Sequence, residues 1–158
     1  MKIMKLLILS FFISTLVKAA EKPVGYFGWH ATGTFHQMGE KAGYWTGEFS
    51  GSFASDKGDD GMFHKMSVRC PAWQKFNFEK GTSVAAGVCY GKDLEGNEVY
   101  FDWIGSEQKL GQPGKGSFSY TGGTGKYEGL KGNGGFFIGH TVTNWKDGSA
   151  SGYATWNK

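Results

Sequence analysis

The sequence predicts an all-β protein: a single small antiparallel β-barrel of about eight strands that follows a signal peptide. After residue 20, apolar and polar residues alternate with a period of two nearly everywhere. No stretch there repeats apolar residues at the i, i+3, i+4 and i+7 spacing of a helix. Turn-forming residues separate the alternating runs, which is typical of an antiparallel barrel or sandwich. Glycines within the runs favour the barrel, because closing a small barrel brings backbones close together.

Residues 1–19 have the layout of a secretory signal peptide, and residues 20–158 form the predicted barrel domain. Lys2 and Lys5 open the segment, an apolar run covers residues 6–17, and Ala19 marks the expected cleavage point. A membrane anchor is the alternative, but a spanning helix needs about 20 apolar residues. This run holds 12 residues with two serines among them. We therefore expect an exported protein, periplasmic or secreted, with no membrane contact in the mature form.

The charge of the chain belongs to the signal segment. The whole chain has 17 Lys and Arg residues against 14 Asp and Glu residues. Without Lys2, Lys5 and Lys18, 14 positive residues stand against 14 negative ones, so the mature chain is neutral. A neutral domain with Arg69 as its only arginine is a poor nucleic-acid binder. Aromatic and charged residues over 73–78 could mimic a base-stacking platform, but export makes that reading weak, and we expect no nucleic acid partner.

The first three expected strands lie between residues 26 and 70. The first places Phe27 and Trp29 on one face, and the second places Trp45 and Phe49 on one face, each against mostly polar residues. In the third, Met62, His64, Met66, Val68 and Cys70 share a face. These strands are Tyr26–Gln37, Gly43–Phe53 and Met62–Cys70.

Five further alternating runs complete the barrel. They are Ser83–Tyr90, Glu98–Ile104, Lys115–Thr121, Gly134–Asn144 and Ser149–Trp156. Turns are expected at residues 56–61, 92–97, 112–114 and 146–148, where Gly, Asp, Asn and Pro gather. No linker or second type of composition divides the chain, so we expect one domain.

Cys70 and Cys89 are the only cysteines, and we expect them to form a disulfide. An even number of cysteines in an exported chain favours pairing. Both lie at ends of expected strands, so a hairpin with a long loop could bring them together. Metal binding is the rival interpretation, but two cysteines without nearby histidines make a poor site.

The glycine-rich segment over residues 121–136 is not a nucleotide-binding loop. Gly125-Lys126 is followed by Tyr127 instead of Ser or Thr, which breaks the phosphate-loop pattern. Glu128 stands where the dinucleotide pattern needs its third glycine.

The same segment, Thr121-Gly-Gly-Thr-Gly-Lys-Tyr-Glu-Gly-Leu-Lys-Gly-Asn-Gly-Gly-Phe136, resembles the glycine motif of the allene oxide cyclase barrel-like superfamily, which includes dirigent proteins. Residues 87–103 are similar to the hairpin of its bacterial secreted members, in which a cysteine strand, an acidic turn and an aromatic strand follow one another. The resemblance covers roughly residues 60–158. It implies an eight-stranded barrel, often trimeric, with an apolar cavity and no cofactor. A lipocalin-like fold is the nearest alternative, but that family ends in a helix.

Candidate catalytic residues are few, and the resemblance transfers none. His64 shares a face with apolar residues, so it would be a polar group in an apolar lumen if that face points inward, as general bases often are. Glu48 and Asp102 are the matching acids, although both are expected to face water. An enzyme is therefore a second hypothesis, as a cofactor-independent isomerase or cyclase, and it needs two of these groups to meet in one pocket.

We expect no metal and no cofactor. The acidic turn at residues 93–98 offers oxygen ligands but lacks the spacing of a calcium loop. His30 and His36 lie about 20 Å apart along one strand, too far to share a metal ion.

The leading hypothesis from the sequence is an exported barrel that binds a small apolar or aromatic molecule in its lumen. A third hypothesis is a homotrimeric structural or interaction module.

Overall fold

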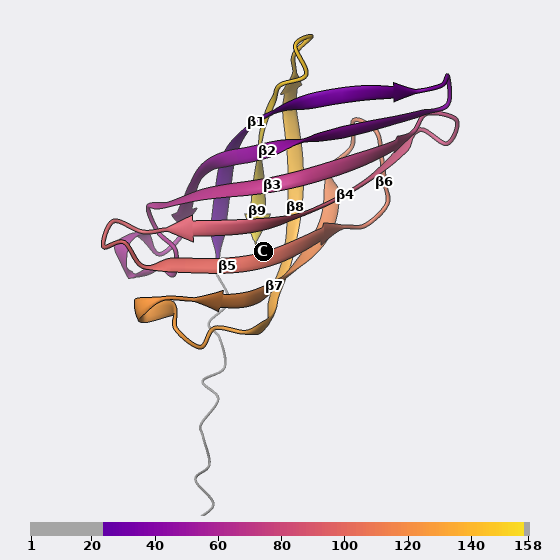
Figure 1. Cartoon of the computed structure of the whole chain (residues 1–158). Helices are drawn as coiled ribbons and strands as arrows, with labels where there is room; N and C mark the ends of the chain where they lie inside the picture. The colour runs from indigo at the N-terminus through magenta and orange to yellow at the C-terminus, as the bar shows by residue number, and fades with distance from the viewer. Residues whose placement is uncertain (1–23, 157–158) are drawn as a thin grey trace, which may run out of the picture.

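The computed structural model describes residues 24–156, and the chain folds there into a closed β-barrel (Figure 1). The predicted signal peptide lies outside the described residues. All strand pairs are antiparallel, and β1 pairs with both β2 and β9, while β3 pairs with β4 to close the ring. The barrel strands are β1 (Gly25–Met38), β2 (Ala42–Ser55), β3 (Met66–Asn77), β4 (Thr82–Lys92), β5 (Glu98–Gly105), β7 (Gly114–Gly123), β8 (Gly132–Asn144) and β9 (Ala150–Trp156).

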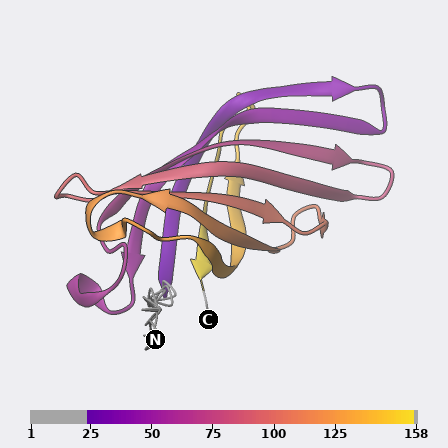
Figure 2. The same cartoon turned by 60° about the horizontal axis from the view of Figure 1, so that its bottom comes forward.

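Three short elements lie outside the eight-stranded ring. β6 (Gln108–Lys109) adds a two-residue strand beside β4. Single 3-10 turns occur in the β2–β3 and β7–β8 connections, as η1 (Gly58–Asp60) and η2 (Gly125–Tyr127). Figures 1 and 2 show β3, β4 and β5 crossing in front of β8 and β9, as two opposite walls of the barrel. The all-β barrel predicted from the sequence is therefore confirmed.

The third predicted strand was wrong at both ends. The strand begins at Met66 instead of Met62 and continues past Cys70 to Asn77. Phe63 and Lys65 have φ angles of 65° and 58°, in the left-handed region, and such residues cannot continue an extended strand. The chain turns there and inserts the Phe63 ring into the protein, where the side chain is 3% exposed.

One end of the barrel is closed by packed aromatic rings. Phe63 lies 5.4 Å from Tyr127 and 6.1 Å from Phe53, between ring centroids. Trp156 stacks against Phe118 at 4.8 Å. All of these side chains are buried. The connections β2–β3, β4–β5 and β7–β8 cover this end, while the other four connections surround the opposite end.

Inside the barrel, aromatic rings lie over glycines of the neighbouring strand. Gly116 pairs with Phe137, and Gly152 pairs with Trp29. A methyl group at Gly116 would lie 2.2 Å from the Phe137 ring, and one at Gly152 would lie 2.4 Å from the Trp29 ring. The glycines therefore provide the space that lets large rings fit inside a narrow barrel, which explains why glycine and aromatic residues alternate along the chain.

Cys70 and Cys89 form a disulfide across β3 and β4, as predicted. The two residues face each other in the middle of paired strands, because Arg69 pairs with Tyr90 and Ala72 with Gly87. The long loop expected between them is instead a hairpin with a short turn at residues 78–81. Both cysteines are buried and face the lumen.

Candidate functional site

The barrel encloses an apolar cavity of about 510 Å³ that opens at the end away from the packed aromatic core. This volume lies within the roughly 300–1,000 Å³ of sites that hold small molecules. The alternation of each strand directs every second side chain inward, so the wall is built from all eight barrel strands. Its large apolar side chains are Phe27, Trp29, Phe35, Trp45, Phe49, Val68, Phe76, Phe78, Phe101, Trp103, Phe118, Phe137, Trp145 and Trp156.

Five aromatic rings form a chain of contacts around the middle of the cavity; we call them the aromatic belt. Phe49 is its centre and lies 5.0 Å from Trp29, 5.4 Å from Trp45 and 6.0 Å from Trp103. Trp103 in turn lies 5.9 Å from Phe137. Most of these contacts are edge-to-face, the arrangement that aromatic pairs favour. Because each ring is held by its neighbours, the wall is preformed.

The polarity of the cavity changes from the floor to the mouth. The floor consists of apolar rings, among them Phe101, Phe118 and Trp156. Polar side chains line the cavity toward its mouth, namely Gln74, Ser106, Gln108, Gln112, Lys115, His140, Thr141, Asn144, Lys146 and Ser149. Gln74 donates a hydrogen bond of 2.9 Å to the buried Ser83 hydroxyl. A molecule in this cavity would therefore have an apolar part in the lumen and any polar part near the mouth.

Three buried donors lack a hydrogen-bond partner among residues 24–156: Trp103 Nε1, Trp156 Nε1 and the Tyr120 hydroxyl. The two tryptophans belong to the cavity wall, whereas Tyr120 does not. Burial raises the pKa of Tyr120, so that its hydroxyl stays neutral. Both indole nitrogens are covered by protein atoms, so they lie unpaired within the wall and are not exposed to the cavity.

The structure does not bring the three predicted catalytic candidates together. Glu48 is on the outer face of β2, where its carboxylate accepts hydrogen bonds from Arg69 at 2.6 and 2.9 Å. The Glu48 hydrogen bonds raise the pKa of Arg69. Asp102 is exposed on β5, on the side opposite the inward-facing Phe101 and Trp103. Neither carboxylate belongs to the cavity wall.

His64 lies at the closed end, in the connection before β3. Its Nδ1 accepts a hydrogen bond of 3.1 Å from the Ser55 backbone N–H, and its Nε2 is 3.5 Å from Asp59. The predicted strand face shared by His64 and Met66 does not form, because the left-handed residues on either side of His64 end the strand pattern. His64 instead anchors the β2–β3 connection.

The acidic turn between β4 and β5 is a structural unit. The Asp93 carboxylate, 5% exposed, lies 2.8 Å from Lys126 Nζ and accepts hydrogen bonds from the Asn97 and Glu95 backbones. Burial alone would raise the pKa of Asp93, but these hydrogen bonds lower it to about 2. The Asp93 contact raises the pKa of Lys126. Within residues 24–156, no group of three His, Cys, Asp or Glu side chains is placed to hold a metal ion.

Sequence reasoning missed the part of the wall that β3 contributes after Cys70. Gln74 and Phe76 face the cavity from that part of the strand. The alternation of Ala72, Gln74 and Phe76 with Trp73 and Lys75 is the signal that could have found them, but Pro71 suggests a strand end. Pro71 is tolerated because the β3–β4 pairing is interrupted at Cys70 and Pro71, so the ladder does not require an N–H from residue 71.

Comparison of the chain with family models, curated proteins and solved structures finds no match. Across the residues that the structure describes, no helix is long and apolar enough to cross a membrane. Fold and cavity therefore define the class by themselves: a closed, eight-stranded, up-and-down antiparallel barrel with an apolar cavity open at one end.

Proposed function

We propose that this protein is exported and binds a small apolar or aromatic molecule in the lumen of its barrel. The observation that carries the proposal is the cavity of about 510 Å³ with its aromatic belt. A barrel whose lumen was filled by its own side chains would have contradicted the proposal. Each buried Å² of apolar ligand surface contributes about 25 cal/mol, and the preformed wall limits the ordering cost of binding.

The cavity selects against strongly polar molecules. A polar ligand group in the floor would lose its water and find mainly carbon, which costs about 1–3 kcal/mol for each unpaired group. We therefore propose a mostly hydrocarbon or aromatic molecule with few polar atoms.

Binding can be tested with N-phenyl-1-naphthylamine, an apolar dye whose fluorescence rises when water is excluded. We expect saturable binding to the purified protein and about ten-fold weaker binding to Ala85→Trp. Ala85 faces the cavity, so an indole there would occupy ligand space. Ala86→Trp is the matched control, because Ala86 is the next residue of β4 and faces the outer side. Equal binding by both variants, or no binding by the wild type, would contradict the proposal.

Native mass spectrometry on protein purified from its own host would identify the natural ligand. A retained molecule of defined mass is expected, and it should be lost from the Ala85→Trp protein. Peptide mapping of the same sample tests export, since a mature chain beginning at residue 20 is expected.

We keep two further expectations as proposals. Membership of the allene oxide cyclase barrel-like superfamily is supported by the eight-stranded barrel and by the position of the glycine motif across β7, η2 and β8. A homotrimer is supported by apolar side chains on the outer face of β4 and β5, where Val88 and Ile104 are 53% and 56% exposed. The isomerase or cyclase alternative has less support, because His64, Glu48 and Asp102 do not meet.

A further inference from the structure

The open end of the barrel carries an unusual set of exposed side chains. Four connections surround the mouth, at residues 39–41, 78–81, 106–113 and 145–149; together with the strand residues next to them we call them the rim. Each rim connection combines an exposed apolar side chain with a nearby lysine. The pairs are Met38 with Lys41, Phe78 with Lys80, Leu110 with Lys109, and Trp145 with Lys146.

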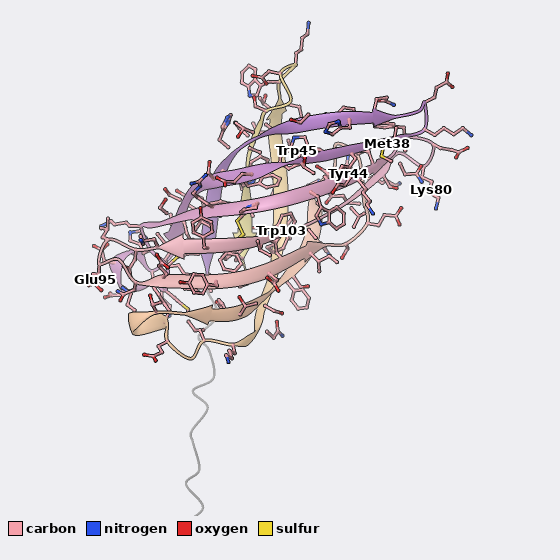
Figure 3. The ribbon with its side chains drawn as sticks, in the orientation of Figure 1. Met38, Tyr44, Trp45, Lys80, Glu95 and Trp103 are labelled. Atoms are coloured by element: carbon pink, nitrogen blue, oxygen red, sulfur yellow. A yellow bond between two sulfur atoms is a disulfide. The ribbon has the colours of Figure 1, made fainter. Side chains whose placement is uncertain are left out.

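The apolar rim side chains are well exposed. Met38 is 61% exposed and Trp145 58%, while Phe78 and Leu110 are each 38% exposed. In the connections of the closed end, Leu94 is the one large apolar side chain among the described residues that is comparably exposed, while Tyr26 and Phe136 are exposed on the strands nearby. Figure 3 shows Met38 and Lys80 together at one end and Glu95 at the other. Single exposed apolar residues are common on soluble proteins, but here four of them surround one opening, each with a lysine nearby.

Charge is also divided between the two ends. The open end has six lysines (41, 75, 80, 109, 115 and 146) against four acids (40, 79, 107 and 147). The closed end has five lysines (57, 65, 92, 126 and 131) against seven acids (56, 59, 60, 93, 95, 98 and 128). The net charge of the mature sequence is zero because a positive excess at the mouth and a negative excess at the base cancel.

We propose that the rim docks on the surface of a phospholipid bilayer that contains anionic lipids. Trp, Phe, Leu and Met side chains enter the boundary between headgroups and acyl chains, where Trp is especially favoured. Lysines beside them extend their charged ends to lipid phosphates, and each contributes modestly near an anionic surface. Docking in this orientation places the apolar cavity mouth against the bilayer.

A bilayer fits the rim better than a protein partner does. The exposed side chains come from four separate connections around an opening, so a protein would need a matched pocket for each one. A fluid interface accepts separate side chains without such matching. The positive excess at the mouth is complementary to anionic headgroups, whereas the negative base would be repelled, and this fixes the orientation.

The test is co-sedimentation of the purified protein with vesicles of phosphatidylcholine, with and without phosphatidylglycerol. We expect the wild type to bind the mixed vesicles, and Met38→Ser/Trp145→Ser to bind roughly ten-fold more weakly. These two residues come from different hairpins and are the most exposed of the four rim residues above, so their replacement leaves the core intact. Leu94→Ser, which removes an apolar side chain that is 85% exposed at the closed end, should bind like the wild type.

A variant with one lysine removed measures the electrostatic contribution to vesicle binding. Lys80→Gln should weaken binding to the phosphatidylglycerol vesicles roughly five-fold and leave binding to pure phosphatidylcholine unchanged. Lys131→Gln, at the closed end, should leave binding to both kinds of vesicle unchanged. Mass spectrometry must show that all variants begin at the same residue, since an uncleaved apolar N-terminal segment would bind vesicles by itself. Thermal unfolding of each variant checks that the fold is kept.

Three results would overturn the inference. They are no binding of the wild type to either kind of vesicle, binding of Met38→Ser/Trp145→Ser that is as tight as that of the wild type, and a loss of vesicle binding in Leu94→Ser that is as large as the loss in Met38→Ser/Trp145→Ser. The outcome is independent of the lumen proposal. The Ala85→Trp protein, with its cavity filled, should still bind vesicles like the wild type. Failure of dye binding with intact vesicle binding would therefore refute the proposed function and leave the docking surface standing.

Discussion

At the scale of single residues, Gly116 shows how the cavity depends on missing side chains. Its position on β7 is directly under the Phe137 ring, and the Ile104 carbonyl oxygen lies 2.7 Å from where a Cβ would stand. Neither the ring nor the backbone can move far, because Phe137 also packs against Trp103. We predict that Gly116→Ala lowers the free energy of unfolding by about 1–3 kcal/mol, measured by urea denaturation.

Gly139 provides the control for that substitution. It is on β8, two residues from Phe137, and a methyl group there would lie 3.8 and 3.9 Å from its nearest neighbours, which are ordinary contact distances. Gly139→Ala should therefore leave the unfolding free energy within about 0.5 kcal/mol of the wild type. An equal loss in both variants would mean that overpacking against Phe137 is not the cause.

Asp93 makes the stability of the β4–β5 turn depend on pH. Its pKa is about 2 in the folded chain, below its ordinary value of 3.8. A lowered folded-state pKa means that the ionised carboxylate stabilises the fold above about pH 4, and that this contribution is lost as the pH falls through 2. The shift corresponds to roughly 2–3 kcal/mol.

Asp93→Asn tests this dependence. We expect the variant to be less stable than the wild type at pH 7, and the difference in unfolding free energy to shrink between pH 4 and pH 2. Glu95→Gln is the control in the same turn, since its carboxylate is 72% exposed, and surface ion pairs contribute little. A difference between Asp93→Asn and the wild type that is the same at all these pH values would contradict the assignment.

At the scale of the elements, the disulfide joins the two strands that close the ring. Cys70 and Cys89 are separated by 19 residues in the sequence, and a cross-link over such a loop stabilises by about 3 kcal/mol in the chain-entropy model. We predict that Cys70→Ala/Cys89→Ala lowers the free energy of unfolding by about 2–4 kcal/mol. The barrel should still form, because the hairpin between β3 and β4 pairs on both sides of the bond.

Burial of the sulfur atoms leads to a second expectation for the same element. Both cysteines are at most 5% exposed, so a reductant such as dithiothreitol should open the bond slowly in the folded protein and rapidly in urea. Alkylation of free thiols followed by mass spectrometry measures the two rates. Rapid reduction without urea would show that the β3–β4 hairpin opens locally.

The period-two pattern predicted most elements because each strand has one face toward the lumen. In β1, the inward positions Phe27 and Ala31 are buried, as the alternation requires. The pattern failed at Phe63 and Lys65, because alternation in sequence does not reveal a left-handed backbone. It also failed after Pro71, where a residue typical of strand ends lies within a long strand.

The cavity was predicted only in outline. Inward aromatic residues such as Trp29, Trp45 and Phe49 follow from the alternation, but sequence does not show how far opposite walls stand apart. That distance depends on strand tilt and on glycines such as Gly152, which decide where a ring lies flat against the wall. His64, Glu48 and Asp102 were chosen by chemical type, and type alone does not place a side chain inside or outside a barrel.

At the scale of the whole molecule, the exposed apolar side chains on the outer wall allow the proposed trimer to be tested. Val88 and Ile104 lie on adjacent strands, since Ala86 pairs with Ile104 and Val88 with Asp102. We predict that size-exclusion chromatography with light scattering gives three times the monomer mass, and that Val88→Ser/Ile104→Ser gives the monomer mass. Val142→Ser is the control, because Val142 is 70% exposed near the rim and should not change the mass. A monomeric wild type would exclude the trimer.

The pairing of β1 with β9 has a practical consequence. Gly25 at the start of β1 stands opposite Trp156 at the end of β9, at the base of the barrel and away from the mouth (Figure 2). A short peptide joining these two positions would make a circular permutant, with new termini opened in the exposed turn at Leu94. Such a protein keeps every strand neighbour while changing their order of synthesis. Its stability and folding rate, compared with those of the wild type, would thus separate the effect of the strand contacts from the effect of the order of the strands in the chain.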